Sequence, residues 1–183
     1  RPAVLLSREN SQLLIVDIQE RLAPAVQDSQ RAVHNSVVLM QAGARLGVPL
    51  TISEQYPKGL GPSVSAIRER AVGHCIVEKV HFSCAAAPEV RARIAAQGAS
   101  QIVIVGMETH VCVLQTALGL RAGGREAFVV EDAVSSRTAE NKAAGLERMR
   151  TGGVHIVTTE MVLFEWLQRA GTPEFKELSA LIR

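Results

Sequence analysis

Cys112 stands in a setting that suits a cysteine nucleophile. The run from Ile102 to Val105 is apolar and β-branched throughout, as in strands buried on both faces of a parallel sheet. Gly106 ends this run, and from Val111 onward apolar residues recur at helical spacing. Cys112 is therefore expected where a helix begins. The partial positive charge there favours a thiolate, and the unpaired N–H groups can receive an oxyanion.

Two further polar residues follow other apolar runs and could complete the chemistry. Asp17 comes after Gln12 to Val16, and Lys79 comes after Cys75 to Glu78. Asp17 can take the proton of the thiol and later hand it to a leaving amine. Lys79 can hold the pair together and steady the thiolate. Taken singly, each has a plainer interpretation: an inert core thiol, a turn or cap carboxylate, and an exposed lysine.

A parallel sheet is the element that must position these side chains. Strands are expected at residues 12–16, 48–53, 75–78, 102–105, 127–130 and 154–157, with Glu131 and Asp132 after the fifth. A helix is expected from Pro24 to Gly47, its inner face marked by Val33, Val37, Met40 and Ala44. Further helices are expected at 63–71, 89–97, from 111, and at 138–150, 160–170 and 174–182, with loops at 54–62 and 81–88. This alternation predicts an α/β fold, a three-layer α/β/α sandwich around a six-stranded parallel sheet. Ligands bind such sheets at the carboxyl ends of the strands, where all three reactive residues fall.

Length and composition narrow the function classes. A chain of 183 residues predicts one domain over residues 1–183. The net charge is only +2 and aromatic residues make up 3%, so neither nucleic acid nor a membrane surface is expected as a partner. The odd, widely spaced cysteines argue against a disulfide scaffold and favour a cytoplasmic protein. No secretory signal is evident, and import into an organelle stays open because a segment could precede Arg1.

Three stretches of the chain form a set of motifs: LLIVDIQERL, EKVHFSC and GMETHVCV. Together they resemble the motifs of the isochorismatase-like cysteine hydrolases, a superfamily that includes nicotinamidases, N-carbamoylsarcosine amidases and isochorismatases. TISEQYPKGLGP and the closing MVLFEWLQRAGTPEFKELSALIR are most similar to the subgroup of isochorismatase domain-containing proteins. The resemblance covers nearly the whole chain. It implies a six-stranded parallel sheet flanked by helices, and a catalytic triad of Asp17, Lys79 and Cys112.

The resemblance also implies a mechanism. A non-proline cis peptide between Met107 and Glu108 is expected before the nucleophile turn, with the N–H groups of Glu108 and Cys112 forming the oxyanion hole. The thiolate attacks, an amine leaves as Asp17 donates a proton, and water activated by Asp17 hydrolyses the acyl-enzyme. The expected activity is that of a cofactor-independent amidase acting on a C–N bond of a small molecule.

Departures from the family pattern refine these expectations. Nicotinamidases carry a metal site with an Asp-x-His pair and a further histidine after the second strand, whereas SEQYPKGLGP contains no histidine. We therefore predict no metal and no cofactor, and nicotinamide is disfavoured as substrate. Isochorismatases proper often lack the cysteine, so the presence of Cys112 favours acyl chemistry. The candidates for lining the pocket are Gln19, Tyr56, His81, Phe82 and His110.

Two other functions remain open at this point. The chain could be a non-catalytic binding or scaffold protein on the same fold, or Cys112 could serve redox chemistry, because an activated thiolate is also easily oxidised. A homo-oligomer, dimer or higher, is expected from the apolar closing helices. Their apolar side chains are Leu163, Phe164, Trp166 and Leu167, and burial in the chain's own core is the alternative.

Overall fold

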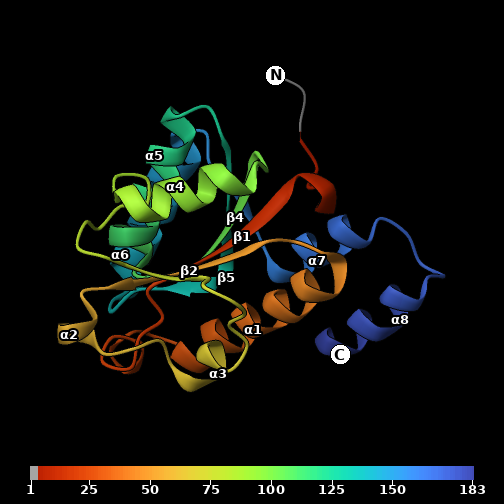
Figure 1. Ribbon diagram of the computed structural model, residues 1–183, viewed down its shortest axis with the longest axis horizontal. Helices are drawn as coiled ribbons and strands as arrows, with labels where there is room; N and C mark the ends of the chain where they lie inside the picture. The colour runs from red at the N-terminus through yellow and green to blue at the C-terminus, as the bar shows by residue number, and fades with distance from the viewer. Residues whose placement is uncertain (1–3) are drawn as a thin grey trace.

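A six-stranded, all-parallel sheet forms the centre of the molecule (Figure 1). The computed structural model describes residues 4–183, so residues 1–3 of the predicted domain lie outside the described part. The strands are β1 (Ser11–Val16), β2 (Leu50–Gln55), β3 (Ile76–Lys79), β4 (Gln101–Met107), β5 (Glu126–Ser135) and β6 (His155–Val157). Their order is β3-β2-β1-β4-β5-β6, which confirms the predicted fold class.

Helices cover both faces of the sheet (Figure 1). One face carries α1 (Ser29–Leu46), α3 (Ser65–Arg68), α7 (Thr159–Leu167) and α8 (Pro173–Ser179). The other face carries α4 (Pro88–Gln97), α5 (Leu114–Ala122) and α6 (Ala139–Thr151). Short helical turns complete the chain: η1 (Arg8–Asn10), η2 (Ala23–Ala25), α2 (Pro57–Leu60), η3 (Thr109–Val113) and η4 (Ala180–Ile182).

The side chains of β1 alternate between two hydrophobic cores. Leu13 and Ile15 pack with the α1 side, whereas Leu14 and Val16 pack with the α5 side. All four are at most 2% exposed. Successive side chains of a strand point to opposite faces, and both faces of this sheet are covered. The apolar run therefore lacks the alternation with polar residues that a half-exposed strand would show.

The first long helix begins later than predicted, and of its four predicted inner-face residues Val33, Val37 and Met40 pack against the core whereas Ala44 does not. Pro24 lies in η2, and Asp28, at φ 47°, separates that turn from α1. Ala44 is exposed instead of facing inward. Ser36 is fully buried, and its hydroxyl donates to the Ala32 carbonyl at 2.7 Å. Ser36 can face the core because its hydroxyl is hydrogen-bonded within its own helix. Apolar residues alone therefore do not mark the buried face of α1.

Strands β2 and β5 extend past their predicted ends, and in β2 a polar residue finds a buried partner there. Glu54 belongs to β2, where its Oε2 accepts hydrogen bonds from the backbone N–H and the hydroxyl of Ser63 at 2.6 and 2.7 Å. The expected loop from 54 therefore starts later, and α2 forms within it. Likewise, Glu131 and Asp132 lie inside β5, which runs on to Ser135.

Gly106 lies within β4 and does not terminate it. Its φ is +123°, a conformation that side chains rarely adopt, and a Cβ there would overlap the carbonyl group of Val16. The central strands β1 and β4 can therefore approach this closely only with glycine at position 106. The same residue marks the point where the strand order reverses, beside the polar groups described below.

Three of the four apolar side chains singled out in the closing helices are buried in the chain's own core. Leu163, Trp166 and Leu167 are at most 2% exposed, whereas Phe164 is 45% exposed. The indole N–H of Trp166 donates to Ser11 Oγ at 3.0 Å. These three residues therefore cannot form a subunit interface, and the homo-oligomer stays a prediction. None of the helices in residues 4–183 is both long and apolar enough to cross a membrane.

Candidate active site

The three predicted catalytic residues meet at the carboxyl edge of the sheet. The strand order reverses between β1 and β4, and crevices at such a reversal are the usual ligand sites of parallel sheets. Asp17 directly follows β1, Cys112 lies on η3 just after β4, and Lys79 ends the edge strand β3. All three are buried, with exposed fractions of 0, 6 and 4%. The turn and surface interpretations of Asp17 and Lys79 are thereby excluded.

Asp17 is the hub of this cluster. Its Oδ2 accepts a hydrogen bond from Lys79 Nζ at 2.9 Å, and its Oδ1 accepts one from Ser53 Oγ at 2.7 Å. The Cys112 thiol lies within hydrogen-bonding reach of the same carboxylate. The φ of Asp17 is +51°, in the left-handed region that Asp tolerates better than most residues. One buried carboxylate thus contacts both the cation and the thiol.

Lys79 uses all three of its ammonium protons. Nζ donates to Asp17 Oδ2 at 2.9 Å, to Gln55 Oε1 at 2.6 Å and to the Phe82 carbonyl at 3.0 Å. An ammonium group has three donors and no acceptor, so its hydrogen-bonding capacity is filled. A buried cation with this set of partners is held in one place, where it can balance the negative charge of Asp17.

Cys112 does not have the preformed thiolate that the sequence suggested. Burial, and next the negative charge of Asp17, raise the pKa of its thiol above the ordinary value, although Lys79 acts in the opposite direction. The helix terminus that was expected to favour the thiolate is outweighed by a low-dielectric site with a carboxylate beside it. The resting thiol therefore keeps its proton, and it would need a base to act as a nucleophile.

Asp17 is placed to be that base. Burial raises the pKa of its carboxyl group, and the charge and hydrogen bonds of Lys79, with those of Cys112 and Ser53, only partly offset this. A carboxylate with a raised pKa is a stronger proton acceptor than one in water. The geometry therefore provides a base, a thiol within its reach, and a cation that stabilises the charged state of the base.

The nucleophile turn carries the backbone feature expected from its motif. The peptide bond between Met107 and Glu108 is cis. The carboxylate of Glu108 is anchored at its other end, because its Oε1 accepts from the backbone N–H of Arg137 at 3.0 Å and from Arg137 Nε at 2.9 Å. The oxyanion hole formed by the N–H groups of Glu108 and Cys112 stays a prediction.

Comparison with known protein families agrees with this site. The family model described as "Isochorismatase domain" matches residues 11–161, a range that contains Asp17, Lys79 and Cys112. The chain belongs to the isochorismatase family.

Individual relatives of this isochorismatase-family chain are similar over nearly its whole length. Isochorismatase domain-containing protein 1 of Danio rerio is 37% identical over 97% of this chain, which spans 62% of that protein. Isochorismatase domain-containing protein 2 of Danio rerio is also 37% identical, over 97% of this chain and 89% of that protein. The solved structure of MAR1 ribonuclease from Caenorhabditis elegans has a TM-score of 0.91 at 32% identity and covers 98% of this chain and 92% of that chain. Family and fold together support a hydrolase.

Gln19 braces the site of this family member and does not line it, contrary to prediction. The side chain is fully buried. Its Oε1 accepts from the backbone N–H of Gln55 at 2.7 Å, and its Nε2 donates to the carbonyls of Gln55 and Gly61, both at 2.9 Å. Since Gln55 in turn contacts Lys79, Gln19 holds the end of β2 in the position that the ammonium group requires.

The other four pocket candidates differ in how they lie relative to Asp17, Lys79 and Cys112. Tyr56 is 55% exposed, and its backbone N–H donates to the Lys79 carbonyl at 2.9 Å. His81 and Phe82 are exposed on the loop after β3, where Phe82 contributes its carbonyl to Lys79. His110 Nδ1 is 2.9 Å from Ser136 Oγ, which ties the ring to the end of β5. Of these four, Tyr56 lines a cavity of about 440 Å³ together with Lys79.

Three residues of the site were missed by sequence reasoning. Ser53 and Gln55 are polar residues two apart in β2, and that spacing places them on one face of a strand, which could have revealed them. Cys84 ends the stretch EKVHFSC, but no spacing pattern in its loop marks it as part of the site. The structure buries it fully and places it near Ser53, Asp17, Lys79 and Cys112.

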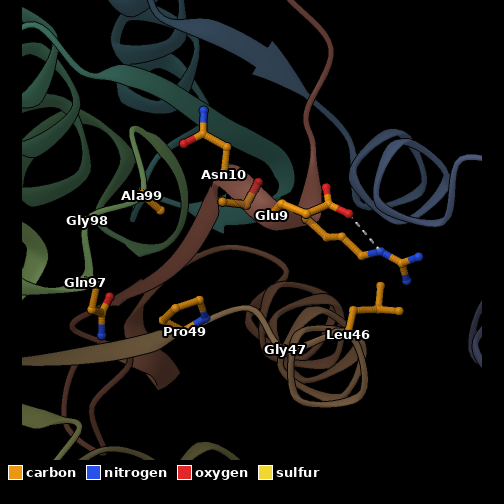
Figure 2. A pocket seen from close by; sticks show the side chains of 10 residues that line it. Glu9, Asn10, Leu46, Gly47, Pro49, Gln97, Gly98 and Ala99 are labelled. Atoms are coloured by element: carbon orange, nitrogen blue, oxygen red, sulfur yellow. Dashed lines mark ion pairs between the residues drawn. The ribbon is translucent and has the colours of Figure 1, made fainter.

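The opposite, amino edge of the sheet contains a cavity without any of these groups (Figure 2). Its volume is about 410 Å³. The lining residues are Arg8, Glu9, Asn10, Ser11, Leu46, Gly47, Pro49, Gln97, Gly98 and Ala99. Among residues 4–183, no group of three or more His, Cys, Asp or Glu side chains is arranged to hold a metal ion. The predicted absence of a metal and of a cofactor stays a prediction.

Proposed function

We propose that this chain is a cofactor-independent cysteine hydrolase that cleaves an amide-type C–N bond of a small molecule through a thioester. The observation that carries the proposal is the contact of one buried carboxylate, Asp17, with both Lys79 and Cys112. A thiol whose pKa is raised is a poor nucleophile unless a base takes its proton. Asp17 is within reach to do so.

The proposed reaction accounts for every proton, and Asp17 carries each of them. Asp17 accepts the thiol proton of Cys112 as the sulfur forms a bond to the substrate carbonyl carbon. When the C–N bond breaks, Asp17 donates that proton to the leaving amine, and a thioester remains on Cys112. Asp17 then takes a proton from water as the water attacks the thioester. Collapse of that intermediate returns the proton to the sulfur and releases the acid.

Two further parts complete the proposed machinery. Lys79 compensates the negative charge that moves between the carboxylate and the sulfur. The N–H groups of Glu108 and Cys112 stabilise the oxyanion of the tetrahedral intermediates, as the family resemblance implies. Backbone donors of this kind act strongly in a site from which water is excluded.

The first test uses a general acyl donor, so it does not depend on knowing the substrate. Native protein and the Cys112→Ala, Asp17→Asn and Cys75→Ala variants are mixed with p-nitrophenyl acetate, and acetylated residues are located by mass spectrometry. Cys112 should be acetylated in the native protein and in Cys75→Ala, which removes a buried thiol from the other core. Acetylation at Cys112 no faster than at Cys75 would overturn the proposal.

A panel of small amides and ureides then follows, with ammonia release as the readout. We expect Cys112→Ala to lower turnover of any substrate found by at least about a thousandfold. Single-stranded RNA is included because one relative is named a ribonuclease. Cleavage of RNA, or amide turnover that survives Cys112→Ala, would contradict the proposed activity.

A further inference from the structure

Cys84 lies on a loop that contacts both α5, the helix that follows Cys112, and Ser53 beside Asp17. Its backbone N–H donates to Thr116 Oγ1 at 2.8 Å, and Thr116 lies on α5, which continues from the turn that carries Cys112. The neighbouring Ser83 hydroxyl donates to the Gln115 carbonyl at 3.2 Å. The loop after β3 is thus attached to the helix of the nucleophile at two successive residues.

The same loop also reaches the base. The Cys84 thiol lies within hydrogen-bonding reach of the hydroxyls of Ser53 and Thr116. Ser53 contacts Asp17 twice, because its carbonyl accepts the Asp17 N–H at 3.1 Å and its hydroxyl donates to Asp17 Oδ1 at 2.7 Å. Ser53 and Cys84 are both completely buried.

The number of protons available decides which group donates in each of these contacts. A serine hydroxyl has one proton, and an ionised carboxylate can only accept, so the proton of Ser53 points to Asp17 Oδ1. The oxygen of Ser53 is then free to accept, and the thiol of Cys84 is a donor beside it. Burial, and next the charge of Asp17, raise the pKa of the Cys84 thiol, so that the thiol keeps its proton.

We propose that Cys84 and Ser53 are positioning residues for Asp17: the Cys84 thiol donates to Ser53 Oγ, which directs the Ser53 proton to Asp17 Oδ1. We call this chain of contacts the Ser53–Cys84 relay. It leaves Oδ2 for Lys79 and holds the carboxyl plane toward Cys112. A hydrogen bond to a carboxylate stabilises its ionised form, so the relay keeps Asp17 able to accept a proton. Its catalytic benefit rests on the proposed function.

The groups that act on Asp17 can be named element by element. Lys79 faces it from β3, Cys112 from η3 and Cys84 from the loop after β3, while β2 contributes the neutral hydroxyl of Ser53. Ser53→Ala removes one donor without altering any of these charges. A change in the titration of Asp17 in that variant therefore reports the lost hydrogen bond.

The direct test follows the titration of Asp17 itself. Protein labelled with ¹³C at the aspartate carboxyl carbons is titrated by NMR, and the Asp17 signal is assigned by its loss in Asp17→Asn. Ser53→Ala should move the Asp17 titration to higher pH, and Cys84→Ala should move it in the same direction by less. Cys84→Ser, which retains a donor, should restore the native curve. Cys75→Ala, another fully buried cysteine, should leave the curve unchanged.

A second readout observes the Cys84 thiol. Its S–H stretching band, assigned by its loss in Cys84→Ala, should lie at the lower frequency of a hydrogen-bonded thiol and rise in Ser53→Ala. An unchanged Asp17 titration in Ser53→Ala would overturn the relay, as would equal titrations of Cys84→Ala and Cys84→Ser or an S–H band insensitive to Ser53.

The relay and the proposed function can fail separately. Acetylation of Cys112 by p-nitrophenyl acetate should fall about tenfold in Ser53→Ala on the acid limb of its pH profile, because a higher pKa leaves less of Asp17 ionised there. A native protein that is not acetylated at Cys112 refutes the hydrolase, while the NMR titration still decides the relay. A normal titration response without any change in acetylation would show that the relay holds Asp17 but does not serve catalysis.

Discussion

The charged groups at the two edges of the parallel sheet differ in how far they are buried. At the carboxyl edge, Asp17 and Lys79 are almost completely buried and pair at 2.9 Å. At the amino edge, Arg8 and Glu9 border the cavity of about 410 Å³, where they are 27 and 69% exposed and 3.6 Å apart (Figure 2). Charges in water are screened, whereas buried charges strongly affect the pKa of their neighbours. The groups that perturb one another's pKa therefore lie at the carboxyl edge, where they are buried and paired, and a cavity alone does not indicate a reactive site.

The largest expected difference between the edges is in stability. Lys79→Met removes the cation from a buried pair and should lower the free energy of unfolding by about 3–5 kcal/mol, because Asp17 is left buried without its partner. Arg8→Met removes a cation from a partly exposed cluster and should cost less than about 1 kcal/mol. Urea denaturation of both variants measures the two values. Equal costs would show that burial does not distinguish the edges.

The second difference is the direction of the pH dependence. The pKa of Cys112 is raised, so above about 9.0, its ordinary value, the unfolded thiol ionises while the native thiol stays protonated. The native state then binds more protons, and the free energy of unfolding falls as pH rises. Cys112→Ala should make this alkaline decline shallower, although Cys84, whose pKa is also raised, retains its share.

At the amino edge the pH dependence of the free energy of unfolding has the opposite sign. A backbone hydrogen bond, and then Arg8, lower the pKa of Glu174 from its ordinary 4.5. The stability that Glu174 contributes is present above 4.5 and is lost as pH falls through the lowered pKa. Glu174→Gln should therefore flatten the acid side of the profile and leave the alkaline side unchanged. Urea denaturation at a series of pH values measures both slopes, and an alkaline effect of Glu174→Gln would contradict the assignment.

The smallest effects are expected from one buried oxygen at each edge. Thr109 Oγ1 and Gln97 Oε1 have no hydrogen-bond partner within the described chain. Thr109→Val and Gln97→Met remove these oxygens and should each change the free energy of unfolding by less than about 1 kcal/mol. The Leu50 carbonyl, which Gln97 contacts, keeps its hydrogen bond from Arg93.

The Thr109→Val and Gln97→Met variants also test which edge of the sheet is reactive. Acetylation of Cys112 should be unaffected by Gln97→Met, which lies at the far edge. A loss of acetylation in Thr109→Val at unchanged stability would sharpen the comparison, because it would place the Thr109 hydroxyl among the groups that contact the reacting atoms. A loss in Gln97→Met would show that the two edges are coupled.

Most of the fold could be predicted from local patterns. The runs in β1 and β4 are apolar without interruption because both faces of the sheet are covered, and such runs are recognisable in a sequence. Errors occurred where a polar residue has a distant partner, as with Glu54 and Ser63. They also occurred at Gly106, whose role depends on how closely another strand approaches.

The residues of the site also divide into those that local patterns identify and those that depend on contacts elsewhere in the chain. Asp17, Lys79 and Cys112 could be selected because topology places the ends of parallel strands at one edge and because their motifs resemble those of a known superfamily. The spacing of Ser53 and Gln55 in β2 was a usable signal that was missed, whereas the importance of Cys84 depends on contacts with residues far along the chain. Gln19 was placed in the pocket because only its side-chain type was visible, whereas its amide is fully engaged by Gln55 and Gly61.

The sequence by itself determined the parallel sheet, the edge at which polar residues gather, and the identity of the three residues proposed as the triad. Periodicity, chain order and side-chain type contain that information. Only the tertiary structure decided that the thiol of Cys112 is protonated at rest, that Lys79 has three partners, and that Cys84 belongs to the site. Protonation depends on burial and on the distances between charges, and both arise only when separate strands and loops pack together.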